Sequence, residues 1–62
     1  MTSNEIKKVM KNERIYQWEL AKTIGVSEFT LSRWLRGSLS KEHEEIIINA
    51  INGMFEEPII EI

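Results

Sequence analysis

The sequence predicts a small all-α domain of four helices, followed by a short extended tail. Apolar residues recur at three- and four-residue spacing in four segments, which is the period of an amphipathic helix. A Ser or Thr stands before three of these segments, where its side-chain oxygen can cap a helix N-terminus. The chain of 62 residues is long enough for one hydrophobic core and no more.

The first helix is expected to begin near residue 2 or 3 and to run to about Asn12. Thr2 and Glu5 have the spacing of a capping box, in which each side chain bonds the backbone N–H of the other residue. The apolar stripe of this helix consists of Ile6, Val9 and Met10. Ile15 and Tyr16 are expected to pack the connection that follows against the core.

The segment 17–37, QWELAKTIGVSEFTLSRWLRG, predicts two short helices joined by a tight turn. Gly25 fits the position just past a helix end, where a positive φ is costly for other residues. Ser27 fits the N-cap of the second helix, and Gly37 ends it. The buried positions are Leu20, Ala21, Ile24, Val26, Leu31, Trp34 and Leu35. This arrangement is a helix-turn-helix, whose second helix usually lies in the DNA major groove.

The same segment resembles the Cro and phage-repressor family of helix-turn-helix proteins, the broad XRE-like group. The motif of that family has Gln first, Ala fifth, Gly ninth and apolar residues at five further positions. All eight are matched, by Gln17, Leu20, Ala21, Ile24, Gly25, Val26, Leu31 and Trp34. The ending SRWLRG is also typical of the family. The resemblance covers about a third of the chain and implies a repressor-like fold that binds DNA.

The resemblance also implies that the second motif helix, about 27–36, meets base edges through its first turns. Glu28, Phe29 and Arg33 occupy the positions concerned. Arg33 is the main candidate for specificity, because a guanidinium can bond guanine O6 and N7 together. The alternative is a surface ion pair between Arg33 and Glu28 or Glu13.

Glu28 and Phe29 are unusual for the family at these positions. Glu28 could accept a hydrogen bond from cytosine N4, or it could be only a favourable charge at a helix N-terminus. Phe29 could touch a thymine methyl group, or it could tuck against Trp18 or the loop. Partial burial is the ordinary expectation for a Phe.

A second set of residues is expected to contact DNA phosphates. In the family the amide at the position of Gln17 contacts a phosphate, and the helix N-terminus assists. The remaining candidates follow from position or charge, and they are Ser27, Thr30, Arg36, Ser38 and Lys41. Such contacts set the register of the protein on DNA and carry no sequence information.

A fourth helix is expected after the loop 37–40, with Ser40 as its N-cap and Gly53 as its end. Its buried stripe consists of Ile47, Ala50, Ile51 and Met54. This stripe leaves Ile46 and Ile48 partly exposed. Repressor domains of this type usually have five helices, so the chain departs from the family after residue 53.

The tail, 54–62, contains Pro58, which argues against a helix. The β-branched residues Ile59, Ile60 and Ile62 could form a strand, and a lone strand needs a partner for its unpaired edges. A homodimer through these residues, or through Ile46 and Ile48, would explain the apolar surfaces and suit a palindromic operator. The alternative is a frayed tail.

The charge of the chain is bipolar. Residues 1–41 hold all eight Lys and Arg against four Glu, whereas residues 42–62 hold six Glu and no Lys or Arg. The formal net charge is therefore −2, but the basic part could approach phosphates while the acidic part faces away. We expect DNA binding to be sensitive to salt.

Several classes of function are not expected. There is no Cys, and His43 has no second His at helical spacing, so we expect no metal or other cofactor and a solvated His43. No catalytic set is visible, so neither an enzyme nor a small-molecule substrate is predicted. Without a long apolar run or a secretion signal, we expect a cytoplasmic protein that binds no membrane, in a bacterial cell or a phage-infected host.

The sequence thus predicts a DNA-binding domain at 1–53, with its motif at 17–37, and a tail at 54–62. The expected function is a sequence-specific transcriptional regulator of phage or mobile-element type that binds double-stranded DNA. One alternative is an antirepressor-like protein-interaction module of the same fold. The other is an architectural or recombination accessory protein that bends DNA.

Overall fold

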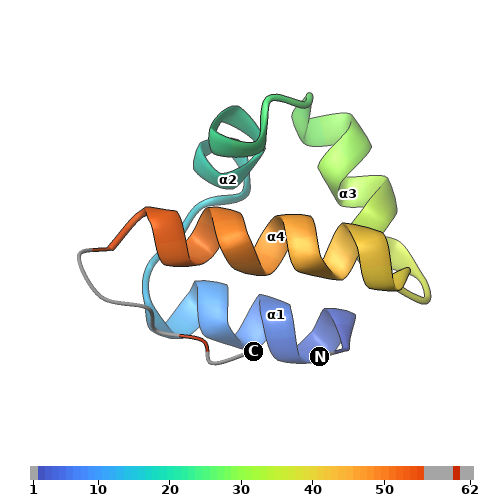
Figure 1. Cartoon of the computed structure of the whole chain (residues 1–62), viewed down its shortest axis with the longest axis horizontal. Coiled ribbons are helices and arrows are strands. Elements are labelled where there is room, and N and C mark those ends of the chain that lie inside the picture. The colour runs from blue at the N-terminus through green and yellow to red at the C-terminus, as the bar shows by residue number, and fades with distance from the viewer. Residues whose placement is uncertain (1, 56–59, 61–62) are drawn as a thin grey trace.

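The structure, a computed structural model, describes residues 2–55 and residue 60 (Figure 1). Four helices and no strand are found within these residues. The helices are α1 (Ser3–Asn12), α2 (Gln17–Ile24), α3 (Glu28–Arg36) and α4 (Lys41–Gly53). The predicted all-α class and the four predicted helices are confirmed.

The start of α1 is fixed by a reciprocal pair of hydrogen bonds. The Glu5 backbone N–H donates to Thr2 Oγ1 at 3.2 Å, and the Thr2 backbone N–H donates to Glu5 Oε1 at 2.9 Å. This is the predicted capping box. The bonds from Thr2 favour the charged carboxylate, so they hold the pKa of Glu5 below its ordinary value of 4.5.

We expect Thr2→Ala to lower the free energy of unfolding by about 1 kcal/mol, because it removes the N-cap acceptor. The stabilisation by Glu5 has a defined pH window. Because its pKa is lower in the folded state, the stabilisation is complete above its unfolded pKa and is lost as the pH falls through the folded pKa. Urea unfolding of Glu5→Gln should therefore differ from wild type at neutral pH and converge with it at an acid pH below the folded pKa of Glu5.

The control for this pH series is Glu13→Gln. The Glu13 carboxylate forms no hydrogen bond or ion pair within the described part of the chain. Its replacement should not reproduce the pH-dependent loss seen with Glu5→Gln. An equal loss at both pH values for Glu5→Gln would contradict the capping role of the carboxylate.

The connection between α2 and α3 follows the predicted turn. Gly25 adopts φ +93°, and both its N–H and that of Val26 donate to the Ala21 carbonyl, at 2.9 and 3.0 Å. A positive φ of this size is readily adopted only by glycine. The Ser27 hydroxyl oxygen accepts from the Thr30 backbone N–H at 3.1 Å and caps α3. The predicted roles of Gly25 and Ser27 are confirmed.

The connection between α1 and α2 also turns through a residue with a left-handed φ, but this residue is not a glycine. Arg14 takes a left-handed φ of 56°, and the Ile15 N–H returns to the Met10 carbonyl at 2.8 Å. Ile15 packs against the core as predicted. The expectation for Tyr16 is wrong, because its side chain is exposed while its backbone N–H donates to the Glu19 carboxylate.

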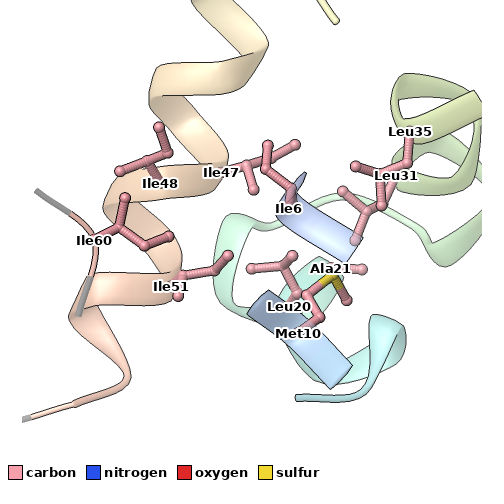
Figure 2. Packing of buried hydrophobic residues seen from close by; sticks show 10 residues of the cluster. All are labelled: Ile6, Met10, Leu20, Ala21, Leu31, Leu35, Ile47, Ile48, Ile51 and Ile60. Atoms are coloured by element: carbon pink, nitrogen blue, oxygen red, sulfur yellow. The ribbon is translucent and has the colours of Figure 1, made fainter. Parts of the chain in front are cut away.

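A single core joins the four helices. Helix α2 packs against both α3 and α4, and α1 contacts α3. Figure 2 shows the buried members of the core, which are Ile6, Met10, Leu20, Ala21, Leu31, Leu35, Ile47, Ile48, Ile51 and Ile60. Partly buried residues at its edge include Val9, Ile24, Val26, Trp34, Ala50 and Met54. The helical stripes predicted from the sequence therefore meet in this core.

The prediction that Ile48 is partly exposed is wrong, because its side chain is only 3% exposed. Ile60 lies against the same part of α4 (Figure 2) and is itself buried. The Asn52 side chain holds this residue: Nδ2 donates to the Ile60 carbonyl at 2.8 Å, and Oδ1 accepts from the Ile60 N–H at 2.9 Å. Ile46 is exposed as predicted, at 36%, while Ile59 and Ile62 lie outside the described residues.

We expect Asn52→Ala to destabilise the protein by about 1–3 kcal/mol, because it leaves two partly buried backbone groups of Ile60 without their partner. Thermal unfolding should show the loss, and amide exchange at Ile60 should accelerate. Asn49→Ala is the control, because Asn49 is exposed on the same helix. Equal effects of the two substitutions would contradict the role given to Asn52.

Candidate nucleic-acid interface

Helix α3 separates a buried face from an exposed one. Leu31 and Leu35 lie in the core, one turn apart. Phe29 and Arg33 are also one turn apart and are both exposed, which places them together on the outer side of the helix. The apolar contacts of Leu31 and Leu35 thus fix the direction in which Phe29 and Arg33 point.

Arg33 forms no ion pair with Glu28, Glu13 or any other residue that the structure describes. The surface ion pair considered as an alternative is therefore not found. The Arg33 guanidinium presents a fixed fork of N–H donors, which matches the paired acceptor atoms of guanine or of a phosphate.

Phe29 does not tuck against Trp18 or the loop, and the expectation of partial burial is wrong. Its side chain is 69% exposed. The reason is the helical period: Phe29 stands two residues before Leu31, so it lies on nearly the opposite side of α3 from the core. The exposed ring thus shares the outer side of α3 with the exposed guanidinium of Arg33, one turn further along.

The first residues of α2 and α3 are directly connected. The Gln17 side-chain Nε2 donates to the Glu28 backbone carbonyl at 3.4 Å. Each residue is the first of its helix, so the bond brings the two helix N-termini together. An amide has two N–H donors, and this bond uses one of them. Glu28 itself is exposed in the first turn of α3, where its charge suits the helix dipole.

The side of α3 next to α4 borders a hollow of about 440 Å³. Its lining residues are Thr30, Arg33, Trp34, Gly37, Ser38, Ser40 and His43. Three of the predicted DNA contacts, Thr30, Arg33 and Ser38, are thus brought to one place. Arg36 and Lys41 are exposed at the end of α3 and the start of α4.

His43 is a residue whose place the sequence analysis missed. It is half-buried, and its ring stacks on Trp34 with centroids 3.9 Å apart and an angle of 11° between the planes. The expectation of a solvated His43 is therefore wrong. Trp34 is half-buried as well and packs against the core, so the stack extends the core toward the hollow.

The Ser27 hydroxyl is occupied within its own helix. Besides accepting from the Thr30 backbone N–H, it donates to Thr30 Oγ1 at 3.0 Å. Ser27 is thereby left without a hydroxyl hydrogen for a phosphate, and the hydroxyl hydrogen of Thr30 remains. Of the two residues predicted to contact phosphate, Thr30 is therefore the one whose hydroxyl hydrogen can be donated to a phosphate.

In the part of the chain that the structure describes, no group of three or more His, Cys, Asp or Glu side chains is placed to hold a metal ion. No helix that the structure describes combines the length and apolarity needed to cross a membrane.

These features define a small all-α domain that exposes one arginine-bearing helix. Comparison of the chain with protein-family models, with curated proteins and with solved structures finds no match. The resemblance to the Cro and phage-repressor family therefore depends on the residues of the motif alone.

Proposed function

We propose that this protein is a sequence-specific DNA-binding regulator of phage or mobile-element type. In this proposal α2 and α3 form a helix-turn-helix of repressor-like fold, and α3 is the recognition helix. The observation that carries the proposal is the outer face of α3, where Phe29 and Arg33 are exposed together and Arg33 has no ion-pair partner among the residues that the structure describes. A helix of this kind suits the major groove, which admits an α-helix and displays base edges to it.

The neighbouring residues fit phosphate contacts around that helix. Arg36 supplies a second cation at the end of α3, and Lys41 supplies one at the start of α4. The Thr30 and Ser38 hydroxyls border the same hollow as Arg33. The second N–H of the Gln17 amide, at the N-terminus of α2, would donate to a phosphate on the other side. These groups would position α3 while its outer face reads the bases.

A homodimer belongs to the proposal, because two recognition helices can read a palindrome with half-sites about 34 Å apart. Ile48 and Ile60 are covered by their own chain. The exposed Ile46 is the described residue that remains for such an interface, together with Ile59 and Ile62 of the predicted tail 54–62. Sedimentation equilibrium without DNA measures this association.

The test of the proposed function is selection from a random duplex library by the wild-type protein at moderate salt. Enrichment of one sequence supports a sequence-reading regulator, and two-fold symmetry in it supports a dimer. A helical circular-dichroism spectrum of the same sample establishes that the protein is folded. No enrichment by folded protein would overturn the proposal.

One observation favours a second candidate function, a protein-interaction module. Trp18 is 53% exposed and borders a hollow of about 540 Å³ near the end of α4. Met54 and Phe55 line the same hollow together with Lys22 and Glu19. Aromatic residues and Met are enriched at protein interfaces, and polar groups form the rim of such interfaces. Failure of the duplex selection would make this surface the better candidate.

A further inference from the structure

Phe29 and Arg33 are spaced so that they can read neighbouring bases. Four helical residues span about 6 Å along the axis. Successive bases of one DNA strand are about 3.4 Å apart. When α3 lies along the groove, the two side chains therefore reach positions one or two bases apart.

We propose that this protein reads a pyrimidine that carries a C5 methyl group, through Phe29, next to a guanine bonded by Arg33. The inference depends on the proposed function and names the base chemistry that it requires. Thymine and 5-methylcytosine carry this methyl group, whereas uracil and unmethylated cytosine do not.

The exposed surface of Phe29 matches a methyl group in being apolar. The Phe29 ring is 69% exposed, so most of its apolar surface faces water in the free protein. The C5 methyl group is an apolar group that the major groove displays, and apolar side chains are its usual partners. Contact between the two removes apolar surface of both from water, which is favourable.

Phe29 differs from the other exposed aromatic residues in its place in the fold. Tyr16 and Trp18 are exposed as well, but they lie at the start of α2. Phe29 alone among these three shares a helix with Arg33 and Arg36. Arg33 and Arg36 outnumber the one acidic residue of α3, Glu28, and this positive balance favours a polyanion such as DNA as the partner of the Phe29 surface.

The test uses duplexes of the sequence recovered by the selection. Each thymine is replaced in turn by deoxyuridine, which removes only the methyl group. We expect one replacement next to a guanine to weaken wild-type binding about fourfold per half-site, the value for one buried methyl-sized group. Cytosine and 5-methylcytosine at the same position distinguish the two sources of the methyl group, and 5-methylcytosine should bind more tightly than cytosine.

The same duplexes are then bound to Phe29→Ala and to Trp18→Ala. Phe29→Ala should bind the thymine and uracil duplexes equally, because the ring that senses the methyl group is gone. Trp18→Ala, the matched control for loss of an exposed aromatic residue, should keep the full difference. Both residues are exposed, so both variants should fold, as circular dichroism will show.

The outcomes separate the inference from the proposed function. An enriched sequence whose methyl dependence disappears only in Phe29→Ala supports both. An enriched sequence with no methyl dependence, or with one that Phe29→Ala retains, overturns the inference while the proposed function stands. No enriched sequence overturns both.

Discussion

Arg33→Ala is expected to weaken binding to the selected duplex by roughly 5- to 150-fold per half-site, the range for a bidentate contact to guanine. The reason is that the guanidinium is exposed and that no residue described by the structure pairs with it. Because the lost contact reads a base, the variant should also lose its preference for guanine at one position. Titration of the wild type and the variant against duplexes with each base at that position measures both effects.

Arg36→Ala is the matched control, because it removes a second exposed arginine from the same helix. We expect it to weaken binding to all duplexes alike and to reduce the salt slope by about 1, which is the behaviour of a phosphate contact. A uniform loss for Arg33→Ala, with the guanine preference intact, would contradict base reading and assign Arg33 to a phosphate.

Leu31→Ala is expected to have the largest effect on stability. Leu31 is 0% exposed at the centre of the core, and such truncations cost about 2–5 kcal/mol. A chain of 62 residues has a total stability of roughly 3–9 kcal/mol, so the variant should lose a large fraction of that stability. Urea unfolding followed by circular dichroism should show a lower midpoint or no folded baseline.

Phe29→Ala provides the comparison on the same helix. It removes a larger apolar side chain than Leu31→Ala does, but from an exposed position. Its free energy of unfolding should stay within about 0.5 kcal/mol of wild type. Similar losses for the two variants would mean that Phe29 is buried and that the outer face of α3 is wrongly assigned.

Features set by neighbouring residues could be predicted from the sequence. The caps at Thr2, Ser27 and Ser40 are such features, because each side chain bonds a backbone group three residues away. The turn at Gly25 depends equally on one local φ. The helix bounds therefore agree closely with the sequence analysis.

Features set by distant residues could not be predicted. Ile48 is covered because Ile60 comes back onto α4, held by the Asn52 side chain. His43 is half-buried because Trp34, on another helix, offers its ring face. Neither contact leaves a periodic signal in the sequence, since each joins residues from different elements or segments.

The candidate site contains features of both kinds, those that depend on neighbouring residues and those that depend on distant ones. The side chains of Phe29 and Arg33 share a face that follows from the helical period. The usual burial of Phe residues led instead to the prediction that Phe29 is partly buried. That prediction was wrong, because the helical period places Phe29 on the side of α3 opposite Leu31. The bond between Gln17 and Glu28 could not be foreseen, because it depends on how α2 and α3 pack.

That bond has a mechanical consequence. The bond joins the first turns of α2 and α3, which are otherwise held together mainly by the packing of the two helices. The bond adds to the helix packing in holding the first residues of α2 and α3 together. In the proposed mode of binding, this bond would therefore link the phosphate contact of Gln17 to the helix that carries Phe29 and Arg33.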